Sequence, residues 1–192
     1  MTRIEGCSSL ILQPGWNRYQ RLLVLLLVLI SGCAPAITSF TDQTTNARIV
    51  RMNGNRLAGG LTGVELNAQQ FEKDGILTYS LVVKYTGPTF IHIDPGQSLI
   101  LTIDGTRYEL QGRGSDQNQR QISIGLVEEK AYYHDLERDL FHRLAYAGDV
   151  EVEIRGTQKT LNRSFKKINF TNFKEFYDHY VSLQIPSQAL SD

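Results

Sequence analysis

The sequence predicts a mainly β, antiparallel β-sandwich-like single domain with about two helices, one of them an amphipathic C-terminal helix. Three observations support this class. Apolar residues recur at every second position in short segments from residue 47 onward, Gly-containing turn pairs separate the segments, and helical spacing appears only twice. About eight mostly antiparallel strands with two helices are typical of a sandwich with helical additions.

The first strands are predicted at residues 47–52, 61–71 and 76–85, and the last of these has the clearest alternation. One of its faces carries Leu77, Tyr79, Leu81, Val83 and Tyr85, whereas the other carries Thr78, Ser80 and Lys84. Asp74-Gly75 predicts a turn just before this strand. We therefore expect the strand before the turn to pair with residues 76–85 as a hairpin.

The middle of the chain continues with short strands between Pro and Gly residues. A brief strand is predicted at residues 90–93 and another at 99–103. Asp104-Gly105 is the strongest hairpin signal, because both residues tolerate positive φ, and residues 107–110 would return antiparallel. Residues 112–121 contain no apolar side chain, which predicts an exposed loop.

Two further strand segments are predicted at 122–126 and 131–133, and after them the apolar residues change from alternate to helical spacing. Leu136, Leu140, Phe141 and Leu144 follow helical spacing, with Asp135 as the expected N-cap and Gly148 as the expected C′ residue. Residues 150–154 then alternate as a half-buried strand. Residues 157–165 are its expected partner, turned at Gly156.

The last predicted element is an amphipathic helix at residues 171–183. Its apolar stripe consists of Phe173, Phe176, Tyr177, Tyr180 and Val181, and the opposite side carries Lys174, Glu175 and Asp178. We expect this stripe to pack on the open face of a sheet. The alternative is a docking helix for a partner protein, which would leave the rings exposed in the free protein.

The N-terminal segment has a different character. Nine apolar residues, 22–30, follow Arg18 and Arg21, and Ser31, Gly32 and Cys33 come next. As a helix the apolar run would span roughly 14 Å, about half of a ~30 Å hydrocarbon core. It is therefore too short for a stable membrane span and has the length of a signal-peptide apolar region.

This segment resembles the lipobox of bacterial lipoproteins, with Cys33 as the acceptor. The resemblance implies that residues 1–32 are a cleaved signal peptide and that Cys33 becomes a lipidated N-terminus. Ala34 stands where an aspartate would imply retention in the inner membrane of a Gram-negative cell. The resemblance thus implies a lipid anchor in the outer membrane, facing the periplasm. Residues 33–46 are Thr-rich and predict a tether, with the globular domain at residues 47–192.

Composition narrows the partners of the exported chain. The whole sequence has 20 basic and 20 acidic residues, and 17 basic and 19 acidic residues follow residue 32. This balance predicts no nucleic-acid partner. Cys7 and Cys33 are the two cysteines, so the globular domain has no thiol for a disulfide, a zinc site or a nucleophile. No cofactor is predicted.

No local motif predicts a catalytic or metal site. His92 and Asp94 stand at i and i+2 of a predicted strand, which allows either half of a metal or acid-base site or a polar strand end. His134 is adjacent to the expected helix cap, His142 flanks an apolar helix face, and His179 lies on the polar side or flank of the last helix. Nucleophile-elbow, phosphate-loop and calcium-loop spacings do not occur.

Positive charge concentrates near the last strand, at Arg155, Lys159, Arg163, Lys166 and Lys167. This could attract anionic lipid head groups, but lysines are also common on an ordinary solvated edge strand. We expect the latter. The resulting functional prediction is a lipid-anchored, non-enzymatic binding or assembly module whose partner is an envelope protein or another envelope component. The alternative is a periplasmic hydrolase or metal-dependent enzyme with a dispersed site around His92 and Asp94.

Overall fold

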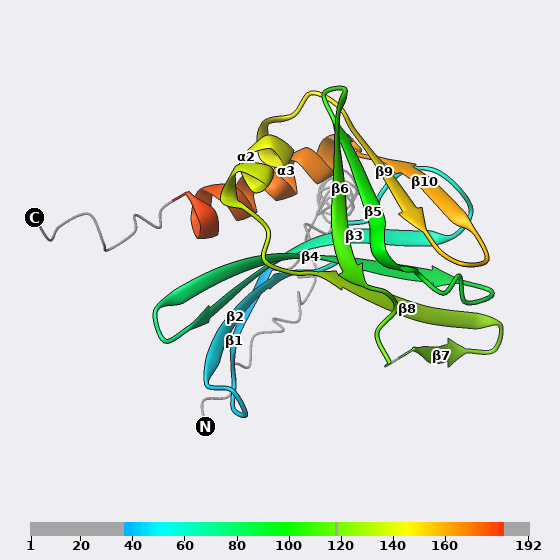
Figure 1. Ribbon diagram of the computed structural model, residues 1–192, viewed down its shortest axis with the longest axis horizontal. Helices are drawn as coiled ribbons and strands as arrows, with labels where there is room; N and C mark the ends of the chain where they lie inside the picture. The colour runs from blue at the N-terminus through cyan, green and yellow to red at the C-terminus, as the bar shows by residue number, and fades with distance from the viewer. Residues whose placement is uncertain (1–36, 118, 183–192) are drawn as a thin grey trace, which may run out of the picture. The chain divides into compact units, whose positions relative to one another are not determined.

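A computed structural model describes residues 37–182 except residue 118, and these residues belong to one compact unit (Figure 1). The strands are β1 (Ile37–Asp42), β2 (Ala47–Met52), β3 (Gly63–Lys73), β4 (Ile76–Gly87), β5 (Pro95–Ile103), β6 (Thr106–Arg113), β7 (Arg120–Ser123), β8 (Leu126–Tyr133), β9 (Val150–Arg155) and β10 (Thr160–Ser164). The helices are α2 (Arg138–Tyr146) and α3 (Lys167–Phe176), and α3 continues into the π-helical turn η1 (Tyr177–Val181).

The strands form two antiparallel sheets. The six-stranded sheet has the order β1-β2-β3-β4-β8-β7, and the four-stranded sheet has the order β10-β9-β5-β6. The four-stranded sheet lies over one part of the six-stranded sheet, and α2 and α3 lie beside it over another part (Figure 1). The predicted β-sandwich-like single domain with two helices is confirmed.

The core lies between these layers because each long strand alternates buried and outward side chains. Leu66, Leu81 and Val83 from the six-stranded sheet share one core with Leu99 and Val152 from the four-stranded sheet. The helices complete this core. The rings of Tyr79 and Phe141 lie 5.6 Å apart, and those of Phe141 and Phe176 lie 6.4 Å apart.

Both predicted hairpin turns form as expected. Asp74 and Gly75 have φ values of 52° and 76°, and Asp104 and Gly105 have 48° and 81°. Positive φ at both central residues is the requirement of a type I′ turn, whose twist matches that of the flanking strands. β3 therefore pairs with β4 over the full length from Gly63↔Thr86 to Lys73↔Ile76.

The fold begins before the predicted boundary at residue 47. Residues 37–42, expected to belong to the tether, form β1 and pair antiparallel with β2 from Ile37↔Met52 to Asp42↔Ala47. Asp42 accepts hydrogen bonds from Thr44 and Thr45, which stabilise the connecting turn and lower the pKa of the Asp42 carboxyl. Most of β1 is exposed, so its pairing leaves little apolar alternation to detect in the sequence.

Two local predictions in the middle of the chain are wrong. Residues 90–93 form a loop with a single bridge, Ile93↔Gly156, instead of a strand, because the backbone amides of residues 91–93 donate to Glu129. α2 begins at Arg138 with Glu137 as its N-cap, whereas Asp135 has φ 56° and lies before the helix. The predicted exposed loop at 112–121 is shorter than expected, since β6 extends through Arg113 and β7 begins at Arg120.

The C-terminal helix begins four residues before the predicted start. The side chain of Asn169 accepts a hydrogen bond from the Lys166 amide at 2.7 Å, which caps the first turn. Phe173 and Phe176 are buried as predicted, and Tyr180 packs against the same core while remaining partly exposed. The helix therefore has the structural role expected for it. Neither helix in the described part of the chain has the length and apolar character of a membrane span.

A buried asparagine cluster attaches α3 to the segment between β2 and β3. Asn55 is fully buried, and its side-chain oxygen accepts hydrogen bonds from Asn169 at 2.7 Å and Asn172 at 2.8 Å. Its amide group donates to the backbone oxygen of Leu66 at 2.8 Å. Because buried polar groups are costly when unpaired, this mutual satisfaction specifies where α3 docks.

Candidate functional site

The predicted lipidation site lies outside the described residues. Cys33 and the Leu22–Cys33 segment precede residue 37, where the described structure begins. The lipobox resemblance therefore stays a prediction. The sites that the structure does describe belong to the globular domain.

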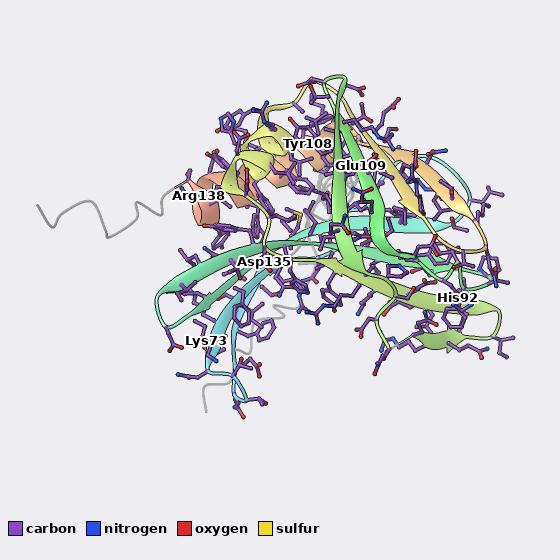
Figure 2. The ribbon with its side chains drawn as sticks, viewed as in Figure 1. Lys73, His92, Tyr108, Glu109, Asp135 and Arg138 are labelled. Atoms are coloured by element: carbon purple, nitrogen blue, oxygen red, sulfur yellow. The ribbon has the colours of Figure 1, made fainter. Side chains whose placement is uncertain are left out.

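His92 and Asp94 do not form a combined site. The His92 side chain is exposed at the end of the sandwich remote from Arg138 and the helices (Figure 2), and its ring lies 5.9 Å from that of Phe90. Asp94 accepts a hydrogen bond from the Thr157 hydroxyl at 2.6 Å. Among the described residues no carboxylate or second histidine bonds to the His92 ring. The geometry consequently gives no support to acid-base chemistry centred on this pair.

The carboxylate of Glu129, which lies near His92, is fully buried and holds a loop of the protein in place. Its Oε2 accepts the backbone amides of Ile91 at 3.0 Å and His92 at 3.2 Å, and its Oε1 accepts that of Ile93 at 2.6 Å and the hydroxyl of Ser115. Four donors occupy the two oxygens, so no lone pair is directed at a substrate. Glu129 instead fixes the loop between β4 and β5.

The other three histidines lie in separate environments. His134 bonds to Ser80 through Nδ1 at 3.1 Å and stacks on Tyr132. His142 packs between Tyr146 and Tyr177, and His179 bonds to the backbone oxygen of Glu175. In the part of the chain that the structure covers, no three His, Cys, Asp or Glu side chains are grouped to hold a metal ion.

The five basic residues near the last strand do not form one patch. Arg155 pairs with Glu153 at 2.8 Å on the outer face of the four-stranded sheet, and Lys159, Lys166 and Lys167 are exposed. Arg163 was expected on a solvated edge strand, but only 9% of it is exposed. Arg163 lies two positions after the buried Leu161, so its side chain leaves β10 on the same inner face as that of Leu161.

The Arg163 guanidinium packs against the backbone of Gly60 and donates to the Asn162 backbone oxygen at 2.7 Å and to the Thr62 hydroxyl at 2.8 Å. Burial lowers the pKa of Arg163. The Asn162 oxygen lies on an edge strand, where a neighbouring strand would otherwise supply its donor. Arg163 therefore closes the edge of the four-stranded sheet next to the loop before β3.

The outer face of the six-stranded sheet carries the clearest candidate binding site. We call it the charged basin, a hollow of about 200 Å³ whose charged lining residues are Arg51, Glu65, Lys84, Arg120, Glu128 and Lys130. Asn53, Asn67 and Tyr132 contribute uncharged polar groups. These side chains come from β2, β3, β4, β7, β8 and the residue after β2, and those on β2, β3, β4 and β8 alternate with buried residues.

Glu128 is the centre of the ion pairs in the charged basin. Arg120 lies 2.9 Å, Lys130 3.4 Å and Lys84 3.6 Å from its carboxylate oxygens, and Lys84 also lies 3.2 Å from Glu65. Burial opposes the ionisation of Glu128, but Lys130, Arg120 and Lys84 more than offset this effect and lower its pKa. The carboxylate is therefore charged at neutral pH.

The charges in the basin do not balance. Among the lining side chains, four cationic groups and two carboxylates leave a surplus of two positive charges, and the Asp116 carboxylate acts on Tyr132 from outside the lining. Arg51 bonds to Gln69 at 3.3 Å and lies over the Phe40 ring, and it has no carboxylate partner among the described residues. A hollow with surplus positive charge and amide and phenol groups at its walls is suited to bind an anionic, hydrogen-bonding group.

No sequence motif marks any residue of the charged basin as a candidate site. Its members lie up to 81 positions apart, from Arg51 to Tyr132, and they come from several separate segments of the sequence. The strand order and register alone bring them together, as the cross-strand pairs Glu65↔Lys84 and Lys84↔Lys130 show. Alternation in the sequence shows which polar residues point outward from each strand. It does not show which residues of the neighbouring strands lie next to them.

Comparison with known proteins does not identify a family. No protein-family model, no curated protein and no solved structure matches the chain.

Proposed function

We propose that this protein is a lipid-anchored cell-envelope protein that acts as a non-enzymatic binding or assembly module. The observation that carries the proposal is the order of features at residues 18–33: two arginines, nine apolar residues, then Ser31, Gly32 and Cys33. Acylation contributes about 0.8 kcal/mol per buried methylene, and one chain alone binds a membrane only reversibly. Several chains on Cys33 would make the anchor permanent, and Ala34 favours the outer membrane, facing the periplasm.

The binding role rests on the globular domain. A sandwich whose outer sheet face holds the charged basin offers a surface for an envelope protein or another envelope component. The buried polar clusters around Asn55 and Glu129 are fully engaged in holding loops and α3 in place. The charged basin, in contrast, presents charged and amide groups at the surface of the sheet.

The anchor is tested by labelling growing cells with a radioactive fatty acid. The wild-type protein should incorporate the label, and Cys33→Ser should abolish it because the acceptor thiol is lost. Cys7→Ser is the matched control, since it removes the other cysteine of the chain and should leave labelling unchanged. Label that persists in Cys33→Ser would refute the proposed site.

The binding role is tested by photo-crosslinking in intact cells. A crosslinking residue at position 38, next to Asn53 at the wall of the charged basin, should capture a defined envelope component that mass spectrometry identifies. The same residue at position 159, in the exposed turn before β10, is the control and should not capture it. Equal capture at both positions would argue against a specific binding face.

A further inference from the structure

Three cationic side chains converge on one carboxylate in the charged basin. Lys84 and Lys130 lie directly opposite each other on β4 and β8, an arrangement of like charges that is unfavourable in a sheet without an anion between them. Glu128 partly supplies that anion, and it also binds Arg120. One carboxylate therefore shares its charge among three cations.

The second carboxylate does not remove the surplus. Glu65 accepts from Lys84, from the Gly54 amide at 3.2 Å and from the Asn67 amide at 3.2 Å, so its oxygens are already engaged. Arg51 adds a fourth positive charge at the same hollow. The basin consequently attracts a doubly charged anion more strongly than a singly charged one, since a dianion would balance both surplus charges.

The size of the hollow limits the ligand. About 200 Å³ is below the roughly 300–1,000 Å³ of pockets that enclose drug-sized molecules. The basin fits one compact group, either free or projecting from a larger molecule. Lysine and arginine both bind phosphate oxygens, arginine with a planar pair of donors and lysine as a point charge.

We propose that the charged basin binds a phosphate monoester or inorganic phosphate through Lys130, Lys84, Arg120 and Arg51. A phosphate monoester carries a charge of about −1.5 to −2 at pH 7, which matches the surplus of the basin. The inference rests on the binding role proposed above and names its ligand. It does not depend on the lipid anchor, so its failure would leave the labelling result at Cys33 unaffected.

The experiment is a calorimetric titration of the full-length protein in detergent with inorganic phosphate at constant ionic strength. We expect saturable binding that Lys130→Gln weakens about tenfold or more, the scale of one lost charge-assisted hydrogen bond. Lys159→Gln makes the same charge change at an exposed site outside the basin and should leave binding unchanged. Arg51→Gln, on a different strand, should weaken binding too and decides the matter if Lys130→Gln does not fold.

Two further ligands separate the sources of the group. Tighter binding of glycerol 3-phosphate than of inorganic phosphate would assign the basin to a phosphate ester borne on a larger envelope molecule, and the reverse order would assign it to free phosphate. Either order supports the proposal. Absence of saturable phosphate binding, equal binding of acetate, or equal weakening by Lys159→Gln would overturn it.

Discussion

Replacement of Phe176 by alanine should strongly destabilise the domain. The Phe176 side chain is fully buried, and its ring lies 5.5 Å from that of Tyr180 and 6.4 Å from that of Phe141 on α2. Removing it opens a cavity at the junction of α2, α3 and the core, where the aromatic neighbours cannot collapse without losing their own contacts. The expected cost is about 3–5 kcal/mol, out of a total stability of roughly 5–15 kcal/mol.

The assay is thermal unfolding followed by circular dichroism. For a domain of this size each kcal/mol lowers the melting temperature by about 2–4 °C, so Phe176→Ala should lower it by about 6–20 °C. Phe40→Ala is the matched control, because Phe40 is 44% exposed and its ring lies under the Arg51 guanidinium at 5.6 Å. It should cost no more than about 1 kcal/mol. An unchanged midpoint for Phe176→Ala would refute the packing argument and favour a docking role for the helix.

Three further predictions concern buried polar groups. Asn55→Ala should destabilise the protein by at least about 2 kcal/mol in urea unfolding, because the amides of Asn169 and Asn172 lose their shared acceptor. Glu129→Gln should speed hydrogen exchange at the amides of residues 91–93, since one carboxylate oxygen is replaced by a competing donor; unchanged exchange would contradict the structural role of this carboxylate. The lowered pKa of Glu128 means that its ion pairs stabilise the protein above its usual pKa of 4.5 and that this stability is lost as the pH falls through the folded value. The difference in unfolding free energy between wild type and Glu128→Gln should therefore shrink from pH 7 to pH 3, and a constant difference would show that the ion pairs contribute nothing.

The alternation of apolar residues in the sequence predicted the strand positions and the fold class. A strand with one buried face must carry apolar residues at every second position. β4 and β9 are the clearest examples, and the turn pairs at residues 74–75 and 104–105 were identified by their tolerance of positive φ. β1 was missed because it has little burial of its own and is held by pairing with β2. The loop at 90–93 resembles a strand in the sequence because Ile91 and Ile93 are buried in the core at alternate positions, whereas their backbone amides donate to Glu129 instead of to a neighbouring strand.

The candidate site could not be predicted in the same way. Arg163 stands at a position of β10 that points into the core. Its guanidinium fits there because Gly60, which has no side chain, lies next to it. The charged basin depends on the placement of β8 beside β4, which puts residues 128–132 next to residues 82–86 and makes Lys84 and Lys130 neighbours. Periodicity defines which face of a strand is outward, but long-range pairing defines which outward residues meet.

We propose that Cys33 is the lipidated first residue of the mature protein. Mass spectrometry of the N-terminal peptide from protein purified from membranes tests this claim most directly. We expect a peptide that begins at Cys33 and carries the mass of covalently attached acyl chains. A peptide that begins elsewhere, or one that contains an unmodified Cys33, would contradict it.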